Sequence, residues 1–340
     1  MLTAFLTHNP EDLQAYYGRA LPELERVAKV VVNPLDHDLA PHELIAAAAN
    51  CDVIIAHRST PGGADIFNAL PKLLAFLRVA VDISTIDVPA ASHAGILIGR
   101  ADKSFVASTA ELALGLMLDL ARNVSASTID YQASGAAPQR PGIQLKGRTA
   151  GIIGYGSIGS YLARLLRELG MHVVICDPAA TIFVTTDGFE SLPLDELLRS
   201  SDFVLPLAPS LPSTHGLINA EALRHVRPGT MLINVSRGEL LDEDAVAAAL
   251  DSGRLGGLAM DVGRSPDQRP SPSLAQRPGV VATPHLGGLT PENAHAQAMS
   301  SVEQVIAIDN RAMPPRSVNG DSAQRLRSWW QALPPERTNP

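Results

Sequence analysis

The sequence has few cysteines and no long apolar run. Among its 340 residues only Cys51 and Cys176 are cysteines, and each lies in or beside an apolar, strand-like stretch. Two cysteines exclude a framework of disulfides and favour a reducing, cytoplasmic setting. No apolar run reaches the roughly 18 to 20 residues of a membrane span, and the opening MLTAFL is too short for a signal peptide and has no basic residue.

Positive charge and metal-ligand clusters are also scarce. Lys and Arg number 27 against 35 Asp and Glu, which gives a net charge of -8. Without a polybasic run, the chain is not expected to bind nucleic acid or an anionic membrane surface. No group of His and Cys has the spacing of a zinc site, so we expect no metal. The 46% of hydrophobic residues is typical of a globular protein, and the length predicts two domains.

Short apolar runs alternate with helical stretches along the chain. The predicted strands are Ala28–Val32, Asp52–Ala56, Ala75–Val79, Ile96–Ile98, Thr149–Ile153, His172–Cys176, Phe203–Leu205, Met231–Asn234, Gly257–Asp261 and Val280–Ala282. The main predicted helices are Glu11–Val27, Pro41–Ala49, Ala64–Ala69, Val88–His93, Ser104–Asn123 and Pro291–Arg311. Such alternation predicts parallel sheets with helices on both faces. In the tail, one of Trp329 and Trp330 is expected to pack against the body of the protein.

The strongest local motif is Gly154-Tyr-Gly156-Ser-Ile-Gly159. It follows the apolar run AGII and precedes an amphipathic helix, SYLARLLRELG. In this context the first glycine permits a tight turn, the second lets a pyrophosphate approach the backbone, and the third lets the helix pack on the strand. The phosphates are expected at the helix N-terminus, where free N–H groups favour anions.

The next predicted strand ends in Asp177, 18 residues after Gly159. A carboxylate at that position accepts hydrogen bonds from both ribose hydroxyls and repels a 2′-phosphate. No Arg or Lys follows in DPAATIF, so the sequence predicts NAD rather than NADP as the cofactor.

Three later strands end in residues that can carry chemistry. Arg237 follows MLIN, Asp261 ends GLAMD, and His285 follows VVATP with Gly-Gly shortly after it. The carboxyl ends of parallel strands meet at the edge where open α/β sheets bind ligands. An Arg, an acid and a His at such an edge, beside an NAD site, indicate a hydride-transfer enzyme.

These segments resemble the D-isomer-specific 2-hydroxyacid dehydrogenase family. The resemblance runs from about Arg58 to the final helix and rests on GRTAGIIGYGSIG, SDFVLPLAPSLPSTHGLI, INVSRGELLDEDAV and ATPHLGG, in that order. It implies an α/β fold in which a Rossmann NAD-binding domain, residues 101–288, is inserted into a flavodoxin-like substrate-binding domain, residues 1–100 and 289–340. It also implies hinges near Arg100 and Gly288, and a homodimer with part of its interface at Ser104–Asn123.

The resemblance further implies roles for single residues. Arg237 matches the arginine that grips the substrate carboxylate and carbonyl oxygen, and His285 matches the general acid–base. Asp261 and the Val235 carbonyl match contacts to the nicotinamide carboxamide. The other matches to cofactor positions are Gly154, Gly156, Ser157, Ile158, Gly159, Asp177 and Pro209, the last on the adenosine side.

The chain departs from the family at its third catalytic residue, a Glu. The Glu position falls on Ser265 or Pro266, and neither is an acid. Asp267 is one residue along and 18 before His285. Either Asp267 raises the pKa of the histidine and sets its tautomer, or no residue does so.

The loop whose N–H groups hold the substrate carboxylate in the family also differs. Its GVGxDxID pattern reads AVDISTID from residue 80, so Asp82 follows Val81 in place of the second glycine. The hinge Asn of the family falls on Arg100, which either offsets Asp82, reaches the substrate, or forms only a surface ion pair. Ser59 follows a predicted strand end and is expected near the substrate, whereas a structural role is favoured for His57.

Three functions follow from these observations. The first, which the sequence favours, is NAD-dependent oxidation of a small D-2-hydroxy acid or reduction of the 2-oxo acid. The second is an NAD(H)-binding sensor or scaffold with weak or no catalysis, which the missing Glu favours and which Arg237 and His285 oppose. The third takes hydride from formate or phosphite, and it is disfavoured because Gln268 is too far along to replace the Glu.

Overall fold

The computed structural model describes residues 1–178 and 187–334, with the backbone alone at residue 267. The chain divides into two compact units. Unit 1 comprises Met1–Ser104 and the chain from Pro291 onward, and unit 2 comprises Phe105–Thr290. None of the helices in the described ranges has the length and apolar character needed to cross a membrane.

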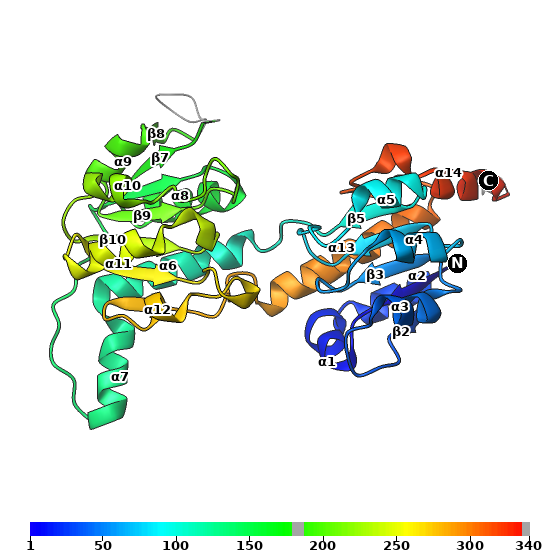
Figure 1. Ribbon diagram of the computed structural model, residues 1–340, viewed down its shortest axis with the longest axis horizontal. Helices are drawn as coiled ribbons and strands as arrows, with labels where there is room; N and C mark the ends of the chain where they lie inside the picture. Colours follow the sequence, from blue (N-terminus) through cyan, green and yellow to red (C-terminus); the bar gives the residue numbers. More distant parts are fainter. Residues whose placement is uncertain (179–186, 335–340) are drawn as a thin grey trace. The chain divides into compact units, whose positions relative to one another are not determined.

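Unit 1 is built on a five-stranded parallel sheet (Figure 1). Its strands are β1 (Leu2–Leu6), β2 (Ala28–Val32), β3 (Val53–Ala56), β4 (Ala75–Arg78) and β5 (Leu97–Arg100). Their order, β2-β1-β3-β4-β5, is the doubly wound order of flavodoxin-like folds. Every residue of β3 and β4 is buried, and the two strands are apolar except for Arg78 at the end of β4.

Helices cover both faces of this sheet. They are α1 (Pro10–Asp12), α2 (Leu21–Val27), α3 (Pro41–Ala48), α4 (Ala64–Ala69), α5 (Val88–His93), α13 (Pro291–Asp309) and α14 (Gln324–Ala332). A π-helical turn, η1 (Leu13–Tyr17), follows α1, and a 3-10 turn, η4 (Gly320–Ser322), precedes α14. One apolar cluster packs beneath α13 and α14 and a second beneath α3 and α4.

Unit 1 contains the predicted elements and one strand that was not predicted. The helical stretch predicted near Glu11–Val27 consists of α1, η1 and α2, and the chain restarts at α2, where Pro22 lacks the N–H that a continuous helix requires. The strand β1 was missed within MLTAFL. The packing of the tail was confirmed, since the Trp330 Nε1–H donates to the Ile308 carbonyl at 2.8 Å.

Unit 2 is built on a seven-stranded parallel sheet. Its strands are β6 (Thr149–Ile153), β7 (His172–Cys176), β8 (Glu190–Ser191), β9 (Phe203–Pro206), β10 (Thr230–Asn234), β11 (Leu255–Met260) and β12 (Val280–Ala282). The order β12-β11-β10-β9-β6-β7-β8 reverses direction at β6, as in Rossmann folds. The predicted α/β class is therefore confirmed for both units.

The helices of unit 2 also cover both faces of its sheet. They are α6 (Val106–Arg122), α7 (Val124–Ser134), α8 (Ser157–Glu168), α9 (Leu194–Ser200), α10 (Ala220–His225), α11 (Glu243–Asp251) and α12 (Pro272–Ala275), with 3-10 turns η2 (Gly238–Leu240) and η3 (Pro266–Gln268). The helix α7 was not predicted. It buries none of its side chains, so it carries no apolar periodicity, and Asn123 in a left-handed conformation separates it from α6.

Candidate active site

The glycine loop lies at the carboxyl end of β6, where the strand order reverses. Gly154 has a φ of +103°, and a Cβ there would lie 2.8 Å from the Ala208 nitrogen. A Cβ on Gly159 would lie 2.1 Å from the Gly154 carbonyl oxygen. The first and third glycines of the motif are therefore required by close backbone packing.

The second glycine serves a different purpose. A Cβ on Gly156 would meet no heavy atom within 4 Å, so the space above it is open. Gly156 is the N-cap of α8, and Ser157 and Ile158 form its first turn, whose N–H groups have no partners within the helix. An open surface at a helix N-terminus fits the pyrophosphate of a dinucleotide.

Asp177 lies beside this loop. Its Oδ2 accepts a hydrogen bond from the Tyr155 N–H at 2.6 Å, which places the carboxylate next to the glycine motif. The strand end is also tied to the loop by the Gly154 N–H, which donates to the Cys176 carbonyl at 2.8 Å. Pro209 lies exposed in the loop after β9, and its carbonyl accepts from the Thr214 hydroxyl at 2.6 Å.

The loop after β10 carries Val235 and Arg237. The buried Asn234 side chain accepts from the Ser236 N–H at 3.1 Å and donates to the Arg237 carbonyl at 2.9 Å. The Ser236 hydroxyl donates to the Ala208 carbonyl at 2.8 Å, which joins this loop to the one after β9. Arg237 is half-buried, on a backbone held by its neighbours.

Asp261 organises the segment that carries His285. Its Oδ1 accepts from the Thr283 hydroxyl at 2.6 Å and from the Leu286 N–H at 2.7 Å, and its Oδ2 accepts from the Gly287 N–H at 2.8 Å. The carboxylate is 1% exposed, so these bonds form away from water. Both of its oxygens thus contact the histidine loop.

His285 has an unusual backbone conformation. Its φ is +63°, a region that residues other than glycine rarely adopt, and its N–H donates to the Thr283 carbonyl at 3.0 Å. Such strain persists where the surroundings impose it, and here the bonds to Asp261 on both sides of the histidine do so. His285, Asp261 and Arg237 follow three adjoining strands, β12, β11 and β10.

The predicted partner of the histidine, Asp267, has a side chain outside the described part of the chain. Its backbone belongs to η3, in a loop that folds back on itself. The Gly263 N–H donates to the Gln268 carbonyl at 2.8 Å and the Ser265 N–H donates to the Arg269 carbonyl at 3.1 Å. Both predictions therefore stay open: either Asp267 takes the role of the missing Glu, or no residue does.

In unit 1, the loop after β4 holds Val81 and Asp82. The exposed Asp82 carboxylate accepts from the Ser84 N–H at 2.9 Å, so one of its oxygens is turned back on its own loop. No ion pair joins it to Arg100 among the described residues; Arg100 is exposed at the end of β5, and its carbonyl accepts from the Gln304 side chain at 3.1 Å.

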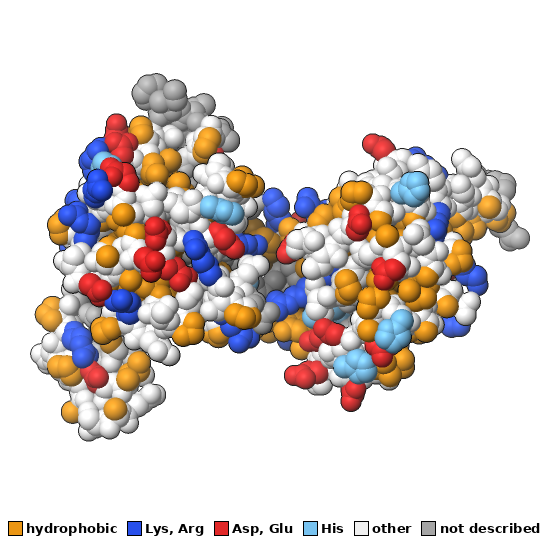
Figure 2. All heavy atoms as spheres, in the orientation of Figure 1, with side chains coloured by type: hydrophobic (Ala, Val, Ile, Leu, Met, Phe, Trp, Pro, Cys, Tyr) orange, Lys and Arg blue, Asp and Glu red, His pale blue; other side chains and the backbone are white. Residues whose placement is uncertain are grey.

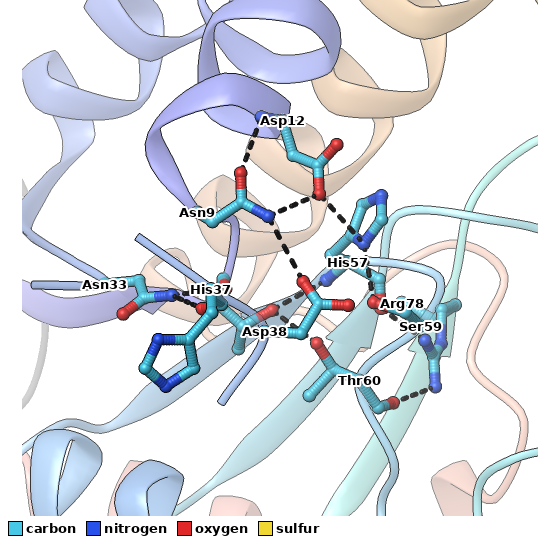
Figure 3. Close-up of polar contacts among 10 residues, drawn as sticks. Asn9, Asp12, Asn33, His37, Asp38, His57, Ser59, Thr60 and Arg78 are labelled. Carbon is cyan, nitrogen blue, oxygen red and sulfur yellow. Dashed lines mark hydrogen bonds and ion pairs between the residues drawn. The ribbon is translucent and has the colours of Figure 1, made fainter. Parts of the chain in front are cut away.

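The cation beside this loop is Arg78, which sequence reasoning missed. Arg78 is fully buried at the end of β4. It donates to the His57 carbonyl and to the Thr60 carbonyl at 2.7 Å (Figure 3). It also donates to the Thr85 hydroxyl at 2.9 Å. Burial lowers the pKa of Arg78 to about 10, although the negative charge of Asp82 acts to raise this pKa. An arginine inside the apolar run AFLRV was the available signal.

Ser59 lies on the neighbouring loop after β3. It is exposed, and its hydroxyl lies 2.8 Å from the Nδ1 of His57, which is buried. Burial is the main cause that lowers the pKa of His57, although Asp12 and Asp38 oppose it.

One cluster of described residues has side chains of the types that bind metal ions. It consists of Asp12, Asp38 and His57, whose ligand atoms lie within 4.8 Å of one another. Figure 3 shows Asn9 between the two carboxylates, and its amide donates to Asp12 at 3.0 Å and to Asp38 at 3.3 Å. One oxygen of each carboxylate therefore accepts a hydrogen bond from this amide.

Comparison with known proteins shows one matching family. Residues 114–287 match the model described as D-isomer specific 2-hydroxyacid dehydrogenase, NAD binding domain. The D-3-phosphoglycerate dehydrogenase of Mycobacterium leprae is 33% identical over 281 residues, which are 82% of this chain and 53% of that protein. The human D-3-phosphoglycerate dehydrogenase is 33% identical over 258 residues, 75% of this chain and 48% of that protein. The chain thus spans about half the length of these curated relatives.

Solved structures give the same result for the fold. A putative D-isomer specific 2-hydroxyacid dehydrogenase from Polaromonas sp. JS6 66 has a TM-score of 0.81 at 26% identity, over 94% of this chain and 99% of that one. D-2-hydroxyisocaproate dehydrogenase has a TM-score of 0.83 at 23% identity, over 94% of this chain and 100% of that one, and shows the fold alone.

Proposed function

Because this chain belongs to the D-isomer specific 2-hydroxyacid dehydrogenase family, with NAD as its cofactor, we propose that it interconverts a D-2-hydroxy acid and the 2-oxo acid. The observation that carries the proposal is the set of three adjoining strand ends, β10, β11 and β12, with Arg237, Asp261 and His285. They lie on the same sheet edge as the glycine loop and Asp177, which fit the dinucleotide.

The proposed chemistry assigns one role to each of two side chains. When bound, NAD supplies the acceptor for the hydride that leaves C2 of the hydroxy acid, or the donor in the reverse direction. His285 takes the hydroxyl proton as the hydride leaves, and returns a proton to the carbonyl oxygen during reduction. Arg237 binds the carboxylate and the carbonyl oxygen through its planar guanidinium. Asp261 holds the histidine loop.

Unit 1 is proposed to bind the substrate carboxylate at the N–H groups of Val81 and Asp82. The buried Arg78 supports this assignment, because its charge lies beneath a loop that also carries the Asp82 carboxylate. Ser59 and Arg100 are proposed to face the rest of the substrate. The relatives named D-3-phosphoglycerate dehydrogenase share only about half their length with this chain, so their substrate is one candidate among several.

The test is NADH oxidation against a panel of 2-oxo acids: glyoxylate, pyruvate, hydroxypyruvate, 3-phosphohydroxypyruvate and bulkier aliphatic and aromatic acids. We expect turnover with one class, and a loss of about a hundredfold or more in the His285→Ala variant with NADH affinity retained. Turnover that survives His285→Ala would contradict the proposed mechanism. NADH binding without turnover of any acid would favour the NAD(H)-binding sensor.

We also propose a homodimer and a reducing, cytoplasmic setting. The dimer is supported by α7, which buries none of its side chains and leaves Val124, Ile129 and Tyr131 53%, 63% and 61% exposed. Figure 2 shows hydrophobic side chains on the surface of this helix. The reducing setting is supported by Cys51 and Cys176, which are both free thiols.

A further inference from the structure

A second carboxylate, Asp187, precedes β8 of unit 2 and shares Tyr155 as a hydrogen-bond partner with the cofactor acid Asp177. The Asp187 Oδ2 accepts a hydrogen bond from the Tyr155 hydroxyl at 2.5 Å, and the same oxygen accepts from Arg164 Nη1 at 3.0 Å. The Tyr155 hydroxyl, together with the charges of Arg164 and Arg167, holds the pKa of Asp187 below its usual range. Asp187 is therefore a carboxylate at neutral pH.

Tyr155 connects this ion pair to the ribose site. Its backbone N–H donates to Asp177 Oδ2 at 2.6 Å while its hydroxyl donates to Asp187. One tyrosine residue thus spans the distance from Asp177, which fits the ribose hydroxyls, to the guanidinium of Arg164. To reach the ribose, the guanidinium of Arg164 would have to cross the span of this one tyrosine.

Arg164 has the chemistry that a 2′-phosphate requires. A guanidinium binds phosphate through two parallel charge-assisted hydrogen bonds, and a nearby Arg is what admits NADP to folds of this type. The sequence DPAATIF from Asp177 onward contains no Lys or Arg, whereas α8 carries Arg164. In this structure the guanidinium of Arg164 forms an ion pair with the carboxylate of Asp187.

We propose that Asp187 is a second residue that selects NAD against NADP, by holding Arg164 away from the ribose 2′ position. Asp177 excludes the 2′-phosphate by direct repulsion, whereas Asp187 acts through Arg164. The side chains of Arg164 and Asp187 are 48% and 35% exposed, so the arginine is free to move once the carboxylate is removed.

Arg167 provides a matched control on the same helix. Its Nη1 donates to the backbone carbonyl of Asp187 at 3.0 Å, and its guanidinium lies 4.6 Å from the centre of the Phe189 ring. Neither contact uses the Asp187 carboxylate, so Arg167 keeps both in an Asp187→Asn variant.

The experiment measures dissociation constants of NADH and NADPH by fluorescence on the full chain. We expect Asp187→Asn to bind NADPH about tenfold more tightly than the wild type, with the NADH constant changed by less than about twofold. Adding Arg164→Gln should remove the gain, whereas adding Arg167→Gln should leave it. No gain in NADPH affinity, or a gain that survives Arg164→Gln, overturns the proposal.

A second comparison does not depend on the folding of Asp187→Asn. In an Asp177→Ser variant the direct repulsion is gone while Asp187 still holds Arg164. We therefore expect Arg164→Gln in that variant to leave NADPH affinity unchanged. A several-fold loss of NADPH affinity would show that Arg164 is already available to the phosphate, and would overturn the proposal. Both comparisons measure binding alone, so they are independent of the substrate and of turnover.

Discussion

At the scale of single residues, Asp261 connects the end of β11 to the loop that carries His285. Its two oxygens accept from Thr283, Leu286 and Gly287, on both sides of His285. The resemblance to the family assigned this acid to the nicotinamide carboxamide. That contact stays a prediction, and we propose in addition that Asp261 is a positioning residue, because its hydrogen bonds flank His285, whose backbone is left-handed.

An Asp261→Asn variant separates these two roles. An amide nitrogen cannot accept, so at least one charge-assisted hydrogen bond to the histidine loop is lost, at a cost of about 1.5 to 3 kcal/mol in unfolding free energy. We expect kcat to fall at least about tenfold while NADH affinity stays within about twofold. Steady-state kinetics and NADH titration measure this, with the exposed Asp244→Asn as control. An equal loss of NADH affinity would support the cofactor contact.

The buried His8 is expected to make the stability of the protein depend on pH. It is 1% exposed, and neither ring nitrogen has a hydrogen-bond partner among the described residues. Burial, followed by the charge of His57, lowers the pKa of His8 from 6.5 to about 3. The folded protein therefore keeps this ring neutral, while the unfolded chain takes up a proton as the pH falls below about 6.5.

The stability that His8 contributes is complete above pH 6.5 and is lost as the pH falls from there toward about 3. We expect the wild type to lose about 1 kcal/mol per pH unit more than a His8→Met variant between pH 6 and 4. Urea unfolding at several pH values measures the difference. The exposed His93→Gln variant should retain the wild-type slope, and identical slopes for the wild type and His8→Met would refute the assignment.

Among the elements, the turn from β6 to α8 contains glycines with opposite surroundings. Gly159 contacts the backbone of Gly154 so closely that no side chain fits, whereas Gly156 faces open space. Gly154 and Gly159 are therefore required by close backbone packing, whereas for Gly156 we propose a role in binding the cofactor. The motif could be predicted from the sequence alone, because the spacing of strand, glycines and helix is local.

Alanine substitutions should separate the two glycines. We expect Gly159→Ala to lower the unfolding free energy by about 2 kcal/mol or more, since its Cβ would lie 2.1 Å from a backbone oxygen. Gly156→Ala should keep the wild-type Tm but lose NADH affinity at least about tenfold. Gly115→Ala, in the middle of α6 with no atom within 4 Å of its Cβ, is the control. It should preserve NADH affinity without lowering the Tm, because Ala favours a helix interior over Gly. A destabilised Gly156→Ala variant would contradict this division.

At the scale of the whole molecule, α7 is the element that the fold of unit 2 does not explain. It buries no residue, yet it is anchored by Asp119, which accepts from the Ser125 N–H at 2.8 Å, and by the ion pair of Asp130 and Arg140 at 2.6 Å. A helix that is held in place but packs against little is suited to contact a second copy of the chain.

The proposed dimer gives a direct prediction. Ile129→Asp combined with Tyr131→Asp places two charges on the exposed face of α7, and burying them at an interface is unfavourable. We expect the variant to sediment as a monomer with an unchanged Tm. Leu169→Asp, at an exposed leucine after α8, is the matched control and should stay dimeric. A wild type that sediments as a monomer, or a variant that still dimerises, would reject α7 as the interface.

The sequence by itself determined the class of fold, the cofactor motif and the strand-end residues Arg237, Asp261 and His285, because each depends on short-range spacing. Tertiary structure decided which groups share a contact. It placed Arg78 beneath the Asp82 loop, tied Asp261 to the histidine loop and paired Asp187 with Arg164. These pairs join residues from separate elements, and only packing of the sheets and helices brings them within hydrogen-bond or electrostatic range.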